Sequence, residues 1–359
     1  MDLSALGWDD FFANHFTPFA SSGFVPARVV LEHKHTCVLY SAAGEFSATC
    51  TGRLLHESAT RTDLPAVGDW VVVRPRLGEA QADIHAVLPR RTKFSRRAAG
   101  DEDVEQIVAA NIDTVFLVSA LDEHFNLRRI ERYLAVAWDS GAQPVIVLNK
   151  SDLHSDPAAI RAEVAALASG APVVAVSAAR DADPAVALGD WLAPGRTVAL
   201  LGASGAGKST LINRLLGTDR QLTGATSDTH GKGRHTTTHR ELIVAPSGSL
   251  VIDTPGMREL QLWDLGAPTL DETFADIAAL ATRCRFSDCR HDAEPGCAMQ
   301  AALAAGTLDP ARWQNFLKLQ REQAYAARKA NPQLARAGRA AWKKITKGQR
   351  VRPRLENED

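Results

Sequence analysis

The stretch that decides the fold of this chain is residues 202–210, which read Gly202-Ala203-Ser204-Gly205-Ala206-Gly207-Lys208-Ser209-Thr210. Its first eight residues match G-x-x-x-x-G-K-[ST], in which the glycines let backbone N–H groups face phosphate oxygens. An apolar run at 197–201 precedes the motif, and a helix-like stretch at 208–216 follows it. A phosphate-binding loop requires this order of strand, loop and helix. The sequence therefore predicts a nucleotide site in which Lys208 neutralises the β- and γ-phosphates and Ser209 is a ligand of Mg²⁺.

Apolar runs on both sides of this loop extend the prediction to a sheet. We expect strands at 114–120, 144–149, 172–177, 197–201, 241–245 and 250–252, separated by helix-like stretches. Runs that are apolar along nearly their whole length are typical of a parallel sheet covered by helices on both faces. The central part of the chain is therefore expected to be an α/β domain.

The base is indicated by a second motif, Asn149-Lys150-Ser151-Asp152, at the end of one of these runs. Ligands bind at this end of the strands in open α/β sheets. The Asp152 carboxylate can accept hydrogen bonds from guanine N1–H and the 2-amino group, an arrangement that adenine lacks. The pair Ser177-Ala178 ends the next run and can direct backbone N–H groups to the guanine O6. The motifs indicate guanine, whereas a polar strand-to-helix cap is the alternative for Asn149–Asp152.

The γ-phosphate side is indicated by Asp253-Thr254-Pro255-Gly256, which follows the run at 250–252. Asp253 is placed to hold Mg²⁺ through a water molecule, and the Gly256 N–H can sense the γ-phosphate. A stretch rich in glycine and threonine lies between this motif and the phosphate loop, and it can supply a threonine hydroxyl to Mg²⁺. Thr237 is the residue we expect, with Thr236 and Thr238 as the alternatives. The alternative for that stretch is a hydroxyl-rich surface loop.

The order of these motifs is unusual, because the base-reading motifs at 149 and 177 precede the phosphate loop at 202. In an ordinary GTPase the phosphate loop comes first. The order here is a circular permutation, which a domain tolerates because its termini often lie close together. As a consequence the chain leaves the domain just after Gly256, which ties the C-terminal region to a nucleotide-dependent switch.

The region before this domain reads as a small β-barrel. Short strands are expected at 25–31, 36–41, 45–51, 70–74 and 83–88, with glycines between them. An oligonucleotide-binding (OB) barrel is one such form, although other small barrels share the pattern. A basic cluster follows and is expected to be an exposed linker or loop; it comprises Arg90, Arg91, Lys93, Arg96 and Arg97.

The region after the domain carries a metal-binding pattern, Cys284-x4-Cys289-x-His291-x5-Cys297. Three thiolates and an imidazole make a closed tetrahedral site for one structural zinc ion, and unrelated thiols are the alternative. A helix is expected to start at Asp309-Pro310, and a second one after Asn331-Pro332. Residues 312–354 hold 13 Lys and Arg residues and one acidic residue, a net charge of +12 that indicates anion binding or a solvated basic tail.

Composition limits the class of protein. The 359 residues are 45% hydrophobic and 23% charged, which is ordinary for a globular protein of two or three domains. No run approaches 18 apolar residues, which argues against a membrane span, and residues 1–24 lack the basic start of a secretory signal. Five cysteines are too few for a disulfide scaffold of this length, so a cytoplasmic protein is expected. We expect an N-terminal extension at 1–24, the barrel at 25–100, the permuted domain at 101–265 and a helical zinc-binding domain with basic C-terminal helices at 266–359.

Taken together, the barrel, the permuted motif order, the phosphate loop, the stretch GRHTTTH at 233–239, DTPG and the Cys/His pattern resemble the RsgA (YjeQ) family. These are bacterial GTPases of small-ribosomal-subunit biogenesis. The resemblance covers residues 25 to 345 and implies an OB barrel, a permuted GTPase domain and a zinc domain. It also implies binding of GTP and GDP with Mg²⁺, and a monomer with the 30S subunit and its 16S rRNA as partners. Its activity would be late 30S maturation with subunit-stimulated hydrolysis.

The catalytic residues expected for hydrolysis are Lys208, Thr237 and His235. Ras-like enzymes orient the attacking water with a Gln after the glycine of DxxG, but Met257 stands there in this chain and cannot form that hydrogen bond. His235 is the best polar substitute, with a solvated loop histidine as the alternative. An RNA-binding assembly module that uses GTP as a conformational ligand remains open, as does a P-loop ATPase or nucleoside kinase, against which Asp152 argues.

Overall fold

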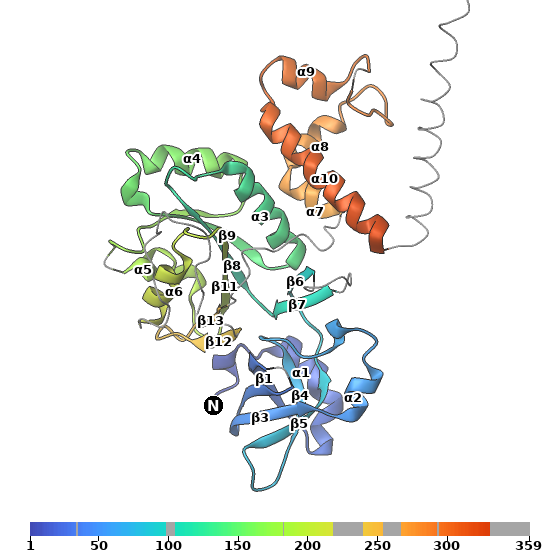
Figure 1. Cartoon of the computed structure of the whole chain (residues 1–359), viewed down its shortest axis with the longest axis vertical. Helices are drawn as coiled ribbons and strands as arrows, with labels where there is room; N and C mark the ends of the chain where they lie inside the picture. The colour runs from blue at the N-terminus through green and yellow to red at the C-terminus, as the bar shows by residue number, and fades with distance from the viewer. Residues whose placement is uncertain are drawn as a thin grey trace, which may run out of the picture. The chain divides into compact units, whose positions relative to one another are not determined.

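The computed structural model describes residues 1–33, 35–97, 105–181, 183–217, 240–253, 267–292 and 294–330. The chain divides into two compact units, residues 1–261 and 262–359. The first unit contains the barrel and the α/β sheet (Figure 1). The second unit contains the Cys/His pattern.

The barrel lies where the sequence predicts it, with every strand boundary within two residues of expectation. Its strands are β1 (Val25–Glu32), β2 (Cys37–Ser41), β3 (Gly44–Cys50), β4 (Trp70–Pro75) and β5 (Gln81–Val87), and the helix α2 (Gly52–Glu57) follows β3. The order β1-β2-β3-β5-β4 closes by pairing of β4 with β1, and β3 runs parallel to β5. Alternate apolar residues such as Val29, Leu39 and Val71 fill the interior. These features confirm the five-stranded OB-type barrel.

The α/β sheet is confirmed as well. Its strands are β8 (Thr114–Ala120), β9 (Gln143–Asn149), β10 (Val173–Ala175), β11 (Thr197–Gly202), β12 (Glu241–Val244) and β13 (Leu250–Asp253). They lie in the order β10-β9-β8-β11-β13-β12 and pair in parallel except for β12, which is antiparallel to β13. The expectation of a parallel sheet is therefore wrong for β12. The reason is the short connection at 245–249, because a parallel neighbour needs a crossover of about a dozen residues.

Helices cover both faces of this sheet (Figure 1). They are α3 (Leu127–Ser140), α4 (Pro157–Leu167), α5 (Pro184–Ala187) and α6 (Lys208–Leu216), with short 3-10 helices at Ser151–Leu153 and Gly189–Trp191. Leu117 and Ile146 belong to the core that contains residues of α3 and α4, whereas Phe116 and Val147 belong to the core that contains residues of α6. Successive strand residues thus enter opposite cores, which explains why the strands are apolar along their length.

Residues 1–24 fold back onto the barrel. They form α1 (Asp10–Phe16) and 3-10 helices at Ser4–Leu6 and Thr17–Ser22. Leu6 and Phe12 are buried in the same core as Trp70 of β4, and the Trp8 ring centroid lies 4.6 Å from that of Trp70. Asp9 caps α1 by accepting hydrogen bonds from the backbone of Phe11 and Phe12. The segment is therefore part of the first unit's core.

A buried arginine joins the barrel to the sheet. Arg28 of β1 is 1% exposed and donates hydrogen bonds to the carbonyl oxygens of Leu6, Gly68 and Asn111 and, over 2.9 Å, to the Thr197 hydroxyl at the start of β11. Burial lowers the pKa of Arg28 to about 10, so the surrounding carbonyl dipoles must offset its lost hydration. The β1 strand also pairs with β12, which makes the barrel and the α/β sheet continuous. Barrel and sheet therefore form one unit.

The basic cluster near residue 90 matches the expected exposed linker or loop only in part, because Arg91 and Lys93 are exposed whereas Arg90 is half-buried and residues 93–97 form a strand. Strand β6 (Lys93–Arg97) pairs with β7 (Glu105–Ala110). A 3-10 helix at Arg61–Asp63 lies earlier in the chain, before β4. Arg90 forms two bonds of 2.6 and 2.7 Å with the buried carboxylate of Asp69, and Lys93 pairs with Glu105 over 2.9 Å. Acidic partners from other segments neutralise this part of the cluster, which local sequence does not reveal.

The second unit contains α7 (Ala267–Thr273), α8 (Ala275–Ala281), α9 (Ala298–Ala304) and α10 (Pro310–Ala330). Phe274, Ile277, Met299 and Trp313 are buried in it. Helix α10 begins as predicted, with the Asp309 carboxylate accepting from the Ala311 N–H over 2.8 Å. The predicted second helix after Asn331-Pro332 lies outside the described residues.

One residue of the basic C-terminal stretch has a structural partner. Arg312 is 4% exposed and makes a bidentate pair with Asp276 over 2.7 and 2.8 Å, so it does not contribute to an anion-binding surface as its place in that stretch suggested. Lys318 and Arg321 on the same helix are exposed. Among the helices of the described ranges, none combines the length and apolar character that crossing a bilayer requires.

Candidate nucleotide site and metal centre

The phosphate loop connects β11 to α6 as the motif predicts (Figure 1). Gly205 and Gly207 have φ angles of +77° and +88°, in the left-handed region that favours glycine. A Cβ on Gly202 would lie 2.2 Å from the Val118 carbonyl oxygen, and one on Gly207 would lie 2.2 Å from Asn149 Nδ2. The glycines are therefore required by the backbone turn and by close contact with two neighbouring strands.

The ammonium group of Lys208 lies against the backbone of the phosphate loop. Lys208 Nζ donates hydrogen bonds to the carbonyl oxygens of Gly202, over 2.7 Å, and Ala203, over 2.6 Å. Ser209 and Thr210 follow in the first turn of α6 and are half-buried. An ammonium group and a helix N-terminus at one loop are an electrostatic environment suited to phosphate.

Asn149 holds three of the predicted motifs together. Its side chain is buried at the end of β9, where Nδ2 donates to the Ala206 carbonyl over 2.9 Å. Its Oδ1 accepts from the Ala178 N–H over 3.0 Å. One amide therefore joins the end of β9 to both the phosphate loop and the Ser177-Ala178 turn.

Asp152 and Ser177 also lie together. The Ser177 hydroxyl donates to Asp152 Oδ1 over 2.5 Å, and Arg180 Nε lies 2.9 Å from Asp152 Oδ2. The Ser177 N–H donates to the Asp181 carboxylate over 2.7 Å, which fixes the turn. Sequence reasoning missed Arg180 and Asp181, although both follow the Ser-Ala pair within four residues.

Asp122 was also missed. Lys150 has a φ of +57° and places its Nζ 2.9 Å from Asp122 Oδ2, in the loop that follows β8. Burial raises the pKa of Asp122, but the Lys150 ammonium and the His124 N–H outweigh that effect and hold the pKa below its ordinary value. Both side chains line a cavity of about 590 Å³ that residues 203–206 of the phosphate loop also line. The only sequence signal for Asp122 is its position just after an apolar run.

Asp253 ends β13, which runs parallel to β11 with Ile252 opposite Ala199. The register places Asp253 at the same edge of the sheet as the phosphate loop. Carboxylate and hydroxyl oxygens are the donors that Mg²⁺ prefers, so Asp253 and Ser209 fit a magnesium ion bound with the nucleotide. His235, Thr237 and Gly256 lie outside the described residues.

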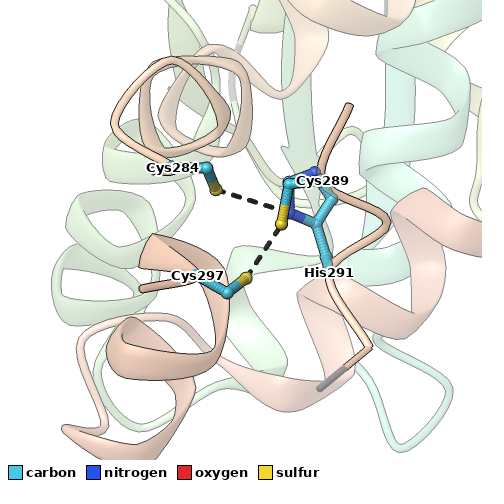
Figure 2. Close-up of side chains that lie close together, drawn as sticks. All are labelled: Cys284, Cys289, His291 and Cys297. Carbon is cyan, nitrogen blue, oxygen red and sulfur yellow. Dashed lines mark hydrogen bonds between the residues drawn. The ribbon is translucent and has the colours of Figure 1, made fainter. Parts of the chain in front are cut away.

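The Cys/His pattern forms one cluster in the second unit (Figure 2). The ligand atoms of Cys284, Cys289, His291 and Cys297 all lie within 4.8 Å of one another, and His291 Nδ1 lies 3.5 Å from Cys284 Sγ and 3.6 Å from Cys297 Sγ. Tetrahedral zinc with bonds of about 2.3 Å to sulfur and about 2.05 Å to nitrogen requires a sulfur-to-nitrogen distance of about 3.6 Å. The donor set therefore fits a structural zinc ion, as predicted.

The surroundings of this cluster suit a cation. Burial and the neighbouring thiols of Cys297 and Cys284 raise the pKa of Cys289 to about 11. At Cys284 burial also acts to raise the pKa, but N–H groups at the start of α9 outweigh it and lower the pKa. Three thiols so close together ionise jointly only beside a positive charge. His291 adopts a φ of +63°, and its carbonyl accepts from Gln300 over 2.6 Å, which fixes the loop.

Comparison with known proteins agrees with this geometry. The family model described as RsgA GTPase matches residues 87–263, and a model described as ABC transporter matches 191–352, a range that includes the same phosphate loop. The small ribosomal subunit biogenesis GTPase RsgA of Opitutus terrae is 66% identical, covering 99% of both chains, and that of Syntrophotalea carbinolica is 46% identical, covering 91% of both. The crystal structure of YjeQ from Thermotoga maritima matches with 26% identity and a TM-score of 0.62, covering 84% of this chain and 98% of that one. YloQ, a circularly permuted GTPase, matches in fold with 22% identity and a TM-score of 0.60, covering 84% of this chain and 96% of that one.

Proposed function

This chain belongs to the RsgA family of GTPases, and on that premise we propose that it hydrolyses GTP to GDP and phosphate while bound to the small (30S) ribosomal subunit. It acts there in late maturation of the subunit, and contact with the subunit stimulates its turnover. The observation that carries the proposal is the side chain of Asn149, which joins the base-reading strand, the Ser-Ala turn and the phosphate loop in one site. Relatives that cover the whole chain are named for biogenesis of this subunit.

Guanine is read by Asp152, with Ser151, Ser177 and Ala178 beside it. The proposal is supported by the hydrogen bond of the Ser177 hydroxyl, which orients one carboxylate oxygen of Asp152. A carboxylate fixed in this way selects a base that presents two adjacent N–H donors, and such a site discriminates strongly because a wrong base leaves its polar groups unpaired. This residue separates a GTPase from the P-loop ATPase or kinase that the phosphate loop alone allows.

The phosphates are held by residues 202–210, with Lys208 offsetting their charge. Ser209, Asp253 and Thr237 would hold the magnesium ion, which supplies positive charge to the phosphate oxygens when bound. The Gly256 N–H senses the γ-phosphate, and His235 orients the attacking water in place of the glutamine that Met257 replaces. Because no such glutamine is present, the free protein hydrolyses GTP slowly, and docking on the subunit brings His235 to the water.

The ribosomal contacts are made by the barrel and by the basic C-terminal region, whose partner is 16S rRNA. The exposed side chains of Lys318 and Arg321 on α10 support this assignment, since phosphate contacts need accessible cations. We assign residues 25–100 to the barrel, 101–265 to the GTPase domain and 266–359 to the zinc domain, in a cytoplasmic monomer.

The test is GTP turnover measured with and without purified 30S subunits. Stimulation by the subunit, together with hydrolysis to GDP, supports the proposal. Binding of GTP to the chain and of the chain to the subunit without turnover would instead identify an RNA-binding assembly module that uses GTP as a conformational ligand.

A further inference from the structure

We propose that Asp122 is a positioning residue for the guanine nucleotide, acting by fixing the side chain of Lys150 across the cavity beside the phosphate loop. This inference rests on the proposed function, because it concerns the same nucleotide site. Asp122 belongs to none of the motifs that identify the site.

The geometry at Lys150 shows that the side chain is held in place from both ends. Its backbone has a φ of +57°, a conformation that side-chain-bearing residues seldom adopt unless their surroundings impose it. The Ser151 N–H, next along the chain, donates to the Val176 carbonyl over 3.1 Å, which anchors the turn to the strand region of β10. At the other end, the Lys150 ammonium lies 2.9 Å from Asp122 Oδ2.

Asp122 is itself fixed before it meets the lysine. Its Oδ1 accepts from the His124 N–H over 3.0 Å, and its backbone carbonyl accepts from the Phe125 N–H over 2.9 Å. The side chain is 21% exposed, which places the ion pair at the wall of the cavity rather than in open solvent. A carboxylate held in a turn loses little conformational freedom when it pairs with lysine, so the pair costs less entropy than one between two flexible side chains.

The position of this pair explains what it can do. Lys150 and Asp122 line the same cavity of about 590 Å³ as residues 203–206 of the phosphate loop. Asp152, which reads the base in our proposal, lies two residues after Lys150. A lysine whose ammonium is fixed presents its methylene chain as an apolar surface, and that surface can cover the flat face of a purine whose edge Asp152 reads. Without Asp122 the lysine side chain is free to leave the cavity.

The direction in which the nucleotide Kd changes distinguishes a positioning role for Asp122 from a purely electrostatic one. A carboxylate in the wall of a site for a polyphosphate repels the ligand, so loss of its charge alone should tighten nucleotide binding. Loss of a positioning residue should weaken binding. Because the base and ribose are common to GDP and GTP, the weakening should be equal for both.

The experiment measures equilibrium Kd values of the full chain for fluorescent GDP and for a non-hydrolysable GTP analogue. In Asp122→Asn the amide oxygen can still accept from the His124 N–H, while the charge that holds Lys150 is lost. We expect Kd to rise about tenfold for both nucleotides. Lys150→Met should give a similar rise in Kd, and adding Asp122→Asn to Lys150→Met should raise the Kd no further. If Asp122 had only a structural role, its substitution would raise the Kd in the Lys150→Met variant as well.

The matched control is Glu123→Gln, which removes one carboxylate from the same loop and the same cavity wall. The Glu123 side chain is 86% exposed and approaches only the neighbouring His124, over 3.7 Å, among the ion pairs of the described ranges. Its Kd should equal that of the parent or be smaller. A Kd for Asp122→Asn that is unchanged or smaller overturns the inference. The inference is also overturned if Asp122→Asn raises the Kd a further tenfold when it is added to Lys150→Met.

A further arm separates this inference from the proposed function. If Asp152→Asn retains the parent's preference for guanine, the assignment of the base site is wrong, whatever Asp122→Asn does. If Asp152→Asn loses that preference while Asp122→Asn binds like the parent, the base site stands and the role of Asp122 is refuted.

Discussion

Replacing Asn149 with alanine tests how the nucleotide site is assembled. The substitution removes two hydrogen bonds of 2.9 and 3.0 Å and leaves the Ala206 carbonyl and the Ala178 N–H without this partner. Both residues are buried, at 4% and 1% exposure. An unsatisfied buried group costs about 1–3 kcal/mol, so the two together cost roughly 2–6 kcal/mol.

The lower part of this range applies to nucleotide binding, because Ser204 and Gly205 of the loop are exposed and the loop can shift to hydrate the Ala206 carbonyl. A cost of about 2–3 kcal/mol corresponds to a rise in Kd for GDP of about 30- to 140-fold, at ~1.4 kcal/mol per factor of ten. The assay is a titration of the folded variant with fluorescent GDP. Asn149→Asp should be at least as damaging, because it places a carboxylate oxygen against the Ala206 carbonyl.

A matched control is Asn111, whose carbonyl accepts a hydrogen bond from Arg28, the buried arginine that joins the barrel to the sheet. Asn111 is buried and has the same pattern of bonds, donating to the Gly68 carbonyl over 3.1 Å and accepting from the Arg91 N–H over 2.9 Å. Its φ is +54°, so Asn111→Gly removes the side chain without backbone strain. This variant should lower the midpoint of thermal unfolding while the Kd for GDP stays within about twofold of the parent. If Asn149→Ala binds GDP like the parent, or Asn111→Gly weakens binding to the same extent, the role given to Asn149 is refuted.

Three further predictions concern the base, the metal and the C-terminal helix. Asp152→Asn should weaken GTP binding and shift preference toward xanthosine triphosphate, whose 2-oxo group needs a donor; unchanged GTP binding in a competition titration would contradict this. Cys289→Ala should lose zinc, measured by elemental analysis, and loosen the second unit while GDP binding persists, because metal affinity is folding free energy; one zinc per chain in the variant would contradict it. Arg312→Met should lower the unfolding temperature of the second unit without changing the salt dependence of RNA binding, since Arg312 is paired with Asp276. Lys318→Gln should do the reverse and reduce the salt slope by about one; equal behaviour of the two variants would show that burial does not separate their roles.

Much of the fold could be predicted because its strands carry strong local signals. The barrel strands and the sheet strands are short runs bounded by glycine or by polar motifs, and the phosphate loop fixes the strand-loop-helix order around Gly202 to Lys208. The zinc pattern was equally local, since its four ligands lie within 14 residues. In each case the residues that determine the structure are close together in the chain.

What could not be predicted depends on partners distant in sequence. The sequence places Arg90 in an exposed linker or loop, but its partner Asp69 comes from the turn before β4, 21 residues away. The sequence places Arg312 in a basic stretch, but the side chain is paired with Asp276, which lies 36 residues before it. Charge counted along a chain does not show which cations already have a carboxylate.

The nucleotide site shows the same division. Its motifs were recognisable, but the side chains that brace them were not, because Asp122 and Asp181 match no spacing rule. They act through geometry at the ends of β8 and β10, where loops from separate parts of the chain meet. Such bracing residues become visible only when the strand order is known.

We propose that the small ribosomal subunit stimulates hydrolysis by this chain, in which Met257 stands where Ras-like enzymes place the water-orienting glutamine. The most direct measurement is the rate of GTP hydrolysis at saturating GTP by the full chain, alone and with 30S subunits, for the parent and for His235→Ala. We expect slow turnover by the free parent and a large stimulation by 30S subunits. We expect His235→Ala to bind GTP and the subunit but to lose most of the stimulation. A free parent that is already as fast as the subunit-bound form would contradict the account, and a fully stimulated His235→Ala would assign the catalytic role to rRNA or to another residue.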